Sequence, residues 1–255
     1  MDLSSFIIAI LPVFLIGFLI YIRDKIKDPS HVLFKLFLLG ILSSIPTIIV
    51  SLFLDIFFPS VEEMNFIQLI LYVFGSIALV EEYFKWLFLY KFSYNHQEFD
   101  STYDMIVYAV FVSLGFACFE NILYVYAYGN ITGLIRAISA VPGHACYGII
   151  MGMYLSIAKI HDINGDISKK NKYMIFSLLI PIIMHGIYDF FAIVGGLLFI
   201  ILFFIFIVFV DIYCIIKVKE LSDNSIRFKY KNKYCTNCGL PVNSNYCTNC
   251  GNKNL

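Results

Sequence analysis

The stretch Ala78-Leu-Val-Glu81-Glu82-Tyr-Phe-Lys85-Trp-Leu-Phe88 places two glutamates and a lysine in a segment otherwise apolar enough for a lipid bilayer. An ionisable side chain at the centre of a bilayer costs roughly 2.5–3.5 kcal/mol on insertion scales, so such side chains are rare and usually serve a function. Four more occur in later apolar segments: Glu120, His144, His185 and Asp189. The sequence therefore predicts a polar site built inside a membrane protein.

The composition is that of an integral membrane protein. Of the 255 residues, 60% are hydrophobic and 14% are charged, and the mean hydropathy is +0.82. Soluble domains are about half apolar and about a quarter charged. Apolar segments near 20 residues predict transmembrane helices, and they lie at 5–22, 34–57, 66–90, 105–127, 133–158, 174–194 and 197–217. The predicted fold is an all-α polytopic membrane protein with about seven transmembrane helices.

The connections between these spans alternate in charge. Lys and Arg follow the first, third, fifth and seventh spans, whereas 59–65, 128–133 and 194–196 contain neither. Positive connections stay in the cytoplasm. We therefore predict a multi-pass cell-membrane protein with its amino terminus outside and its carboxyl terminus in the cytoplasm. The boundary between the sixth and seventh spans depends on the Gly195-Gly196 pair.

The carboxyl-terminal tail is predicted to be a separate module. We divide the chain into a transmembrane helical domain, 1–217, a basic linker, 218–233, and a zinc ribbon, 234–255. Two Cys-x-x-Cys-Gly motifs in the tail contribute Cys235, Cys238, Cys247 and Cys250. Four thiolates from paired tight turns suit the tetrahedral preference of Zn²⁺ and leave no open coordination position, so the predicted zinc is structural.

Two disulfides are the alternative pairing of these cysteines, and a cytoplasmic tail disfavours it because thiols stay reduced there. The tail resembles the short zinc ribbons often fused to prokaryotic membrane proteins, which places the protein in a prokaryotic cell membrane. The ribbon either binds a cytosolic protein partner or merely ends the chain, and no nucleic-acid partner is expected. Cys118, Cys146 and Cys214 lie in apolar spans and are predicted to be small buried hydrophobes.

The ionisable residues of the third and sixth spans are spaced to interact within their helices. Glu81 and Lys85 are i, i+4, and Glu82 is i, i+3 from Lys85. An internal Glu–Lys pair would hold one carboxylate ionised and leave the other for chemistry. His185 and Asp189 are i, i+4, so Asp189 is placed to orient the imidazole.

The fourth and fifth spans carry features for close packing and for bending. Glu120 follows Phe116 by one turn, and Gly115 would let another helix approach closely. The Pro142-Gly143 pair before His144 predicts a bend that frees backbone groups beside the imidazole.

The excess of acidic side chains in the spans needs compensation. Glu81, Glu82, Glu120 and Asp189 carry four negative charges against one from Lys85 when the histidines are neutral, so protons must be shared, histidines charged or a divalent cation bound. A lone buried histidine would more often be a contact between helices. Two adjacent glutamates with two histidines on neighbouring spans favour an active site.

In this order, these motifs resemble the PrsW family of intramembrane proteases, which is related to the CAAX-processing and Abi membrane proteases. The resemblance rests on Glu81-Glu82-x-x-Lys85, Phe116-x-x-x-Glu120 and His185-x-x-x-Asp189. The stretches Tyr103-Asp104…Tyr108 and Arg136…Pro142-Gly143-His144 are also similar to the family's. The likeness covers about 70–195 and implies cleavage of membrane-anchored proteins, with an anti-sigma factor, cut on the outer side of the membrane, as the substrate of characterised members.

Two mechanisms agree with the sequence. In the first, Glu81 or Glu82 activates water as general base, while His144 and His185, the latter oriented by Asp189, stabilise the oxyanion or protonate the leaving amine. In the second, Glu82, His144 and His185 bind a catalytic divalent metal, because two histidines and a glutamate form a common zinc set. Glu120 completes the polar network in both.

Two other classes of function remain open at this stage. Acidic residues and histidines also build the relays of ion- or proton-coupled transporters and channels, although no inverted repeat is evident. A non-catalytic scaffold that recruits a partner through its ribbon is the third class. Flux across liposomes would indicate the transporter, and loss of function on deletion of 234–255 would indicate the scaffold.

Overall fold

The computed structural model describes residues 2–228, 235, 237–240, 242 and 246–253. Throughout the membrane domain the chain is helical. The elements are α1 (Leu3–Arg23), α2 (Ser30–Asp55), η1 (Val61–Glu63), α3 (Phe66–Leu71), η2 (Tyr72–Ala78), α4 (Leu79–Ser93), α5 (Asp104–Tyr128), α6 (Asn130–Ile138), α7 (Ala140–Ile163), α8 (Ile167–Val194) and α9 (Gly196–Asp223).

Among the described residues, seven helical segments are long and apolar enough to cross a membrane, which confirms the predicted fold class. The third span is the continuous run α3–η2–α4, and the fifth is the pair α6–α7. The sixth and seventh spans separate at Gly195 and Gly196, whose φ angles of 69° and 80° lie in the left-handed region that favours glycine.

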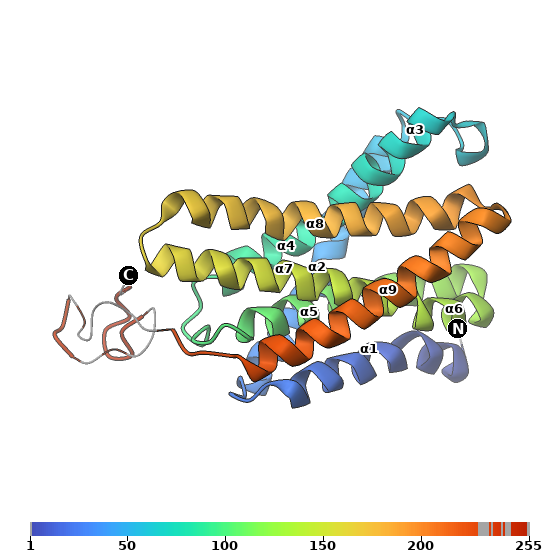
Figure 1. The fold of residues 1–255 in the computed structure, drawn as a ribbon. Helices are drawn as coiled ribbons and strands as arrows, with labels where there is room; N and C mark the ends of the chain where they lie inside the picture. Colours follow the sequence, from blue (N-terminus) through green and yellow to red (C-terminus); the bar gives the residue numbers. More distant parts are fainter. Residues whose placement is uncertain (1, 229–234, 236, 241, 243–245, 254–255) are drawn as a thin grey trace.

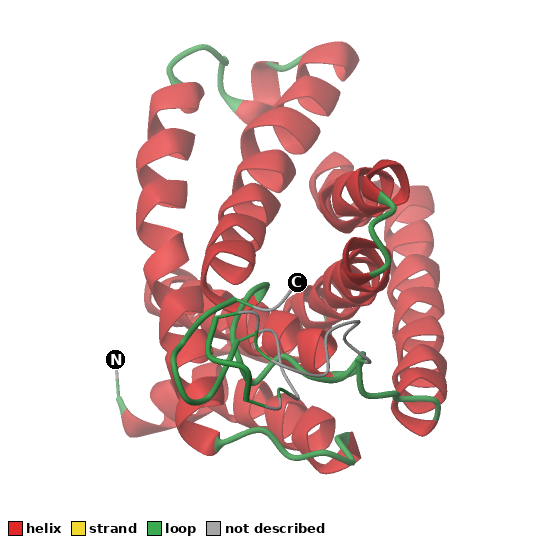
Figure 2. Ribbon diagram, turned by 90° about the vertical axis from the view of Figure 1, so that its left-hand side faces the viewer, coloured by secondary structure: helices red, strands yellow, loops and turns green. Residues whose placement is uncertain are grey.

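The two ends of the bundle carry different segments (Figure 1). The amino terminus and the connections α5–α6 and α8–α9 lie at one end, and the carboxyl-terminal tail lies at the other with the connections α1–α2, α4–α5 and α7–α8. Figure 2, viewed from the tail end, shows the tail in front of the helix ends. This arrangement matches the alternation of charge, and which end is cytoplasmic stays a prediction.

Helices α5 and α7 form the centre of the bundle. They are the most buried spans, and α5 packs against α1, α2 and α7. Helices α2 and α5 touch through glycines, because a Cβ added at Gly115 would lie 2.0 Å from the Phe37 carbonyl oxygen and one at Gly40 would lie 2.0 Å from that of Val112. The close approach predicted at Gly115 is therefore confirmed.

Replacing Gly115 by alanine is expected to lower the free energy of unfolding by at least about 2 kcal/mol, since overpacking of a tight helix contact forces the backbones apart. The matched control is Gly17→Ala in α1, where the new Cβ meets nothing closer than Leu114 Cδ1 at 3.4 Å. Thermal unfolding in detergent measures both variants. Equal midpoints for the two would show that the α2–α5 contact is not close-packed.

The bend predicted in the fifth span occurs one turn earlier than Pro142. The helix breaks at Ser139 (φ −124°, ψ −69°), which ends α6 and begins α7. A proline ring in a helix clashes with the carbonyl four residues before it, here that of Ile138, so the break precedes the proline. Tyr188 of α8 donates a hydrogen bond to Ser139 Oγ over 3.0 Å, which ties the break to the sixth span.

The third span contains a π-helical turn, η2, immediately before the glutamate pair. Such widened turns occur often at functional sites. Helix α8 packs closely on this turn, because a Cβ at Gly186 would lie 2.3 Å from the Phe74 ring. The apolar pattern of the third span gave no sign of this irregularity.

Helix α9 continues to Asp223, five residues past the predicted start of the linker at 218. Lys217 and Glu220 pair over 2.7 Å on its surface and support the extra turns. Beyond it, 225–228 lies along the α4–α5 connection, where Thr102 N donates to the Ile226 carbonyl over 3.0 Å and Phe228 N donates to that of Asp100 over 2.8 Å. The rest of the predicted linker, 229–233, lies outside the described residues.

Candidate active site

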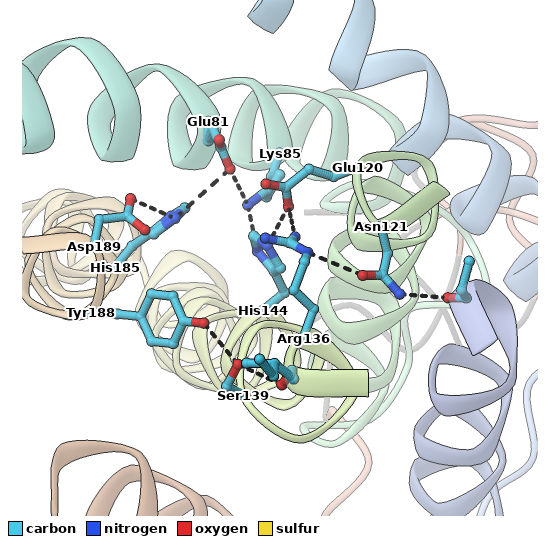
Figure 3. Close-up of polar contacts among 12 residues, drawn as sticks. Glu81, Lys85, Glu120, Asn121, Arg136, Ser139, His144, His185, Tyr188 and Asp189 are labelled. Carbon is cyan, nitrogen blue, oxygen red and sulfur yellow. Dashed lines mark hydrogen bonds and ion pairs between the residues drawn. The ribbon is translucent and has the colours of Figure 1, made fainter. Parts of the chain in front are cut away.

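The predicted site residues of four spans meet in one hydrogen-bonded cluster (Figure 3). Its centre is Lys85, whose Nζ lies 2.8 Å from Glu82 Oε1, 3.4 Å from Glu81 Oε2 and 3.0 Å from His144 Nδ1. The ammonium also lies 4.0 Å from the centroid of the Phe116 ring. Lys85 thus joins α4 to α5 and α7.

Both glutamates of α4 pair with Lys85, but at different distances and with different exposure. Glu82 precedes Lys85 by three residues and makes the shorter contact with it, and the Glu82 side chain is 0% exposed. Glu81 makes the longer contact and its side chain is 13% exposed. Glu82 is therefore the carboxylate that the lysine fixes, and Glu81 is the one that faces accessible space.

His185 of α8 is surrounded by carboxylates. Its Nδ1 lies 2.9 Å from Glu82 Oε1, while Nε2 lies 3.3 Å from Asp189 Oδ2 and 3.9 Å from Glu81 Oε2. The ring stacks on Tyr147 with centroids 5.1 Å apart. An imidazole whose two nitrogens both face acceptors either carries two protons or presents a lone pair to a bound cation.

The second histidine links the centre of the cluster to an ion pair. His144 Nε2 lies 2.8 Å from Glu120 Oε2, and the same oxygen lies 2.9 Å from an Arg136 guanidinium nitrogen. The His144 and His185 rings are 5.3 Å apart, centroid to centroid. Glu120, which the sequence placed only in the surrounding network, therefore contacts one of the candidate metal ligands.

The sequence did not reveal that Arg136 belongs to the cluster. The notable signal was its position in an otherwise uncharged run, 130–143. Its Nε donates to Asn121 Oδ1 over 3.0 Å, and Asn121 in turn donates to the Ala9 carbonyl over 2.8 Å. The guanidinium also stacks on Tyr124, 3.9 Å from the ring centroid. The first span thereby helps to hold the cluster in place.

Three carboxylates of the cluster are partly accessible. The side chains of Glu120 and Asp189 are 19% and 18% exposed, and Glu81 is accessible on the same cluster. Glu82, Lys85, His144 and His185 are buried behind them.

The donor set suits a divalent cation. Ligand atoms of Glu81, Glu82, His144 and His185 all lie within 4.8 Å of one another. Glu82 Oε2 is buried without a hydrogen-bond partner among the described residues. A carboxylate and imidazole set of this kind is common at catalytic zinc sites.

The charge balance points the same way. The cluster contains four carboxylates, those of Glu81, Glu82, Glu120 and Asp189, and two cationic side chains, Lys85 and Arg136. With neutral histidines this leaves two negative charges in excess, which one divalent cation neutralises.

The four tail cysteines form a second group. Their sulfurs all lie within 4.8 Å of one another, with Cys235 3.6 Å from Cys250 and Cys238 3.4 Å from Cys247. These sulfurs are not joined as disulfides. The two motifs fold alike, since Gly239 N donates to the Cys235 carbonyl and Gly251 N to that of Cys247, each over 2.8 Å. This is the geometry of paired knuckles around one metal ion.

The fold and the cluster define a polytopic membrane enzyme with a carboxylate and imidazole centre inside its helical bundle. A family model described as "PrsW family intramembrane metalloprotease" matches residues 28–213. The chain belongs to this family and is an intramembrane protease.

Curated relatives agree with the family match. The chain is 37% identical over 207 residues to Protease PrsW of Oceanobacillus iheyensis, covering 81% of this chain and 91% of the relative. It is 33% identical over 197 residues to Protease PrsW of Clostridioides difficile, covering 74% and 79%. It is 35% identical over 178 residues to Protease PrsW of Bacillus subtilis, covering 67% and 74%. No solved structure matches the chain.

Proposed function

We propose that this protease hydrolyses a peptide bond of membrane-anchored proteins at the Glu81–His185 cluster. The observation that carries the proposal is the convergence of the α4 glutamates and lysine with two histidines from separate spans: His144 contacts Lys85, and His185 contacts Glu82. Hydrolysis of an amide needs a base within reach of water and preorganised positive charge at the developing oxyanion. The cluster contains both.

Glu81 is the general base in this proposal. It is the more accessible of the two glutamates and makes the looser contact with Lys85. Glu82 is bound by Lys85 and His185 and has the fixed orientation of a ligand or positioning group. His185 is held between Glu82 and Asp189, and Glu81 passes the proton that it takes from water to the leaving amine.

The metal-dependent form is the one we propose, with Glu82, His144 and His185 as ligands. The orphaned Glu82 oxygen and the two excess negative charges support it, as does the family description as metalloproteases. A bound divalent metal would polarise the scissile carbonyl and lower the pKa of water. Glu120 and Arg136 position His144, and Lys85 positions Glu82.

We further propose a single-span substrate of the anti-sigma-factor type, cut from the outer side in a regulated cascade, with the amino terminus outside and the tail in the cytoplasm. The charge of the connections supports this orientation, and the family resemblance supports the substrate. The ribbon, with a structural zinc on its four cysteines, would then be available to a cytosolic partner.

The test uses the full-length protein in proteoliposomes with single-span candidate substrates, and cleavage within or next to the membrane is expected. Mass spectrometry of the products locates the cut. Ion flux without any cleavage would overturn the proposal in favour of a transporter.

Removal of the metal from the catalytic cluster is expected to abolish cleavage, independently of the zinc in the ribbon. In a variant with Cys235, Cys238, Cys247 and Cys250 all changed to serine, about one equivalent of divalent metal should remain, and a chelator should remove it together with activity. Elemental analysis and the cleavage assay measure the two quantities. A ribbon variant that cleaves normally with no bound metal would instead support the metal-free mechanism.

A further inference from the structure

A second group of acidic side chains lies at the tail end of the bundle, away from the catalytic cluster. Asp24 and Asp28 belong to the α1–α2 connection, and Asp104 is the first residue of α5. They are only 3%, 6% and 1% exposed, and one oxygen of each lies within 4.8 Å of the others. Glu120 is sixteen residues further along α5, roughly 24 Å away at 1.5 Å per residue.

One of the three carboxylates accepts hydrogen bonds on both of its oxygens. Asp104 accepts hydrogen bonds from Asp100 N at 2.9 Å and Ser101 N at 2.7 Å, and a further one from the Ser101 hydroxyl. These bonds fix the α4–α5 connection at the start of α5. They also leave Asp104 rigidly placed beside the other two carboxylates.

The other two carboxylates each use only one oxygen. Asp24 Oδ1 accepts from Ile26 N over 3.0 Å, and Asp28 Oδ1 accepts from the Tyr108 hydroxyl over 2.6 Å. Asp24 Oδ2 and Asp28 Oδ2 are buried and have no hydrogen-bond partner in the described part of the chain. Leaving such an oxygen unpaired costs about 1–3 kcal/mol or more when it is charged.

An independent polar group also lacks a partner here. Tyr103 is 1% exposed, and its hydroxyl makes no hydrogen bond to any described residue. Burial, and next the negative charge of Asp24, raise the pKa of this phenol.

Two lysines at this end form their hydrogen bonds and ion pairs with other groups. Lys25 pairs with Asp223 over 3.1 Å, and Lys27 donates to the Tyr21 carbonyl. None of the three carboxylates forms an ion pair with any residue that the structure describes. Burial, and next the charge of Asp104, raise the pKa of the Asp28 carboxyl to about 8, which reflects the lack of a countercharge.

We propose that Asp24, Asp28 and Asp104 bind a hard divalent cation, Mg²⁺ or Ca²⁺, with the Tyr103 hydroxyl beside it. The available donors are all oxygens, which these cations prefer and which soft metals do not. Three carboxylates with two free oxygens supply the charge that a dication neutralises. Water completes its coordination, as is usual for Mg²⁺.

The cation would fasten three separate segments of the chain together. It joins the α1–α2 connection to the start of α5, and Asp104 reaches the tail through Ser101, whose hydroxyl lies 3.4 Å from that of Ser225. Occupancy of the site therefore stabilises the attachment of the segment that leads to the ribbon.

The experiment measures binding of Mn²⁺, a spin probe for oxygen-ligand sites, by electron paramagnetic resonance. The full-length chain carries Glu82→Gln and His185→Ala, so that the catalytic cluster does not contribute. One bound Mn²⁺ per chain is expected, displaced by Mg²⁺ or by Ca²⁺, and the concentration each requires identifies the preferred ion. Asp24→Asn and Asp28→Asn should each weaken binding at least tenfold.

Asp223→Asn is the matched control, because this exposed aspartate lies at the same end and pairs only with Lys25 among the described residues. It should bind Mn²⁺ as the parent does. Thermal unfolding gives a second readout: the midpoint of the parent should rise with added cation, and that of Asp28→Asn should not respond. Absence of bound Mn²⁺ in the parent chain, or unchanged binding in both Asn variants, overturns the proposal.

Discussion

Glu81→Gln is expected to lower the rate of substrate cleavage by about 10²–10⁴-fold, the usual contribution of a general base. Glutamine keeps the size of the side chain but cannot accept a proton from water. Because Glu81 contacts Lys85 only at 3.4 Å and retains exposure, the variant should fold as the parent does. The measurement is cleavage in proteoliposomes, with thermal unfolding to verify the fold.

Two companion variants sharpen this result. Glu82→Gln should also abolish cleavage but should in addition release the catalytic metal, since Glu82 is the proposed ligand. Glu62→Gln, an exposed glutamate of η1 outside the spans, should cleave normally. Full activity of Glu81→Gln and Glu82→Gln together would falsify the hydrolytic role of the cluster.

Lys85→Met is expected to cost about 3–5 kcal/mol of stability, the range for removing one partner of a buried ion pair. The ammonium is fully buried and contacts Glu81, Glu82 and His144. Methionine has a similar length and no charge, so it leaves two carboxylates in the bundle without their nearest cation. Activity should be lost as well, because Glu82 and His144 lose the group that positions them.

A double variant separates these two effects. Adding Glu82→Gln to Lys85→Met removes the stranded charge and should recover a large part of the stability, with no recovery of cleavage. Lys25→Met is the control: its pair with Asp223 is more than half exposed on both sides, so the loss should be within about 1 kcal/mol. Unfolding in mixed micelles measures all three. Equal losses for Lys85→Met and Lys25→Met would show that the buried pairing adds no stability.

The seven spans were predictable because hydrophobicity over about 20 residues is a local property of the sequence. The boundaries differ from the structure by at most seven residues: α8 begins at Ile167, seven residues before the predicted start, and α9 continues beyond the apolar run to Asp223, six residues past the predicted end. There the helix leaves the apolar pattern and is held by surface pairing such as Lys217–Glu220. A hydropathy pattern does not predict a polar helical turn of this kind.

The candidate site residues could also be identified individually from the sequence. Each ionisable side chain in an apolar span stands out because burying its charge is costly. The spacing of His185 and Asp189 predicted their contact, which the structure places at 3.3 Å. What spacing left open was the preferred partner of Lys85, which proved to be Glu82.

The sequence by itself determined the number of spans, the cysteine knuckles of the tail and the set of polar residues that the membrane must accommodate, since these follow from local composition and spacing. Only the tertiary structure decided that these residues meet, that Arg136 adds a second positive charge to the cluster, and that Asp24, Asp28 and Asp104 form an acidic group at the tail end. The reason is geometric: the rotation and tilt of each helix are set by contacts with its neighbours, such as the glycine contact of α2 with α5. No single span encodes those contacts.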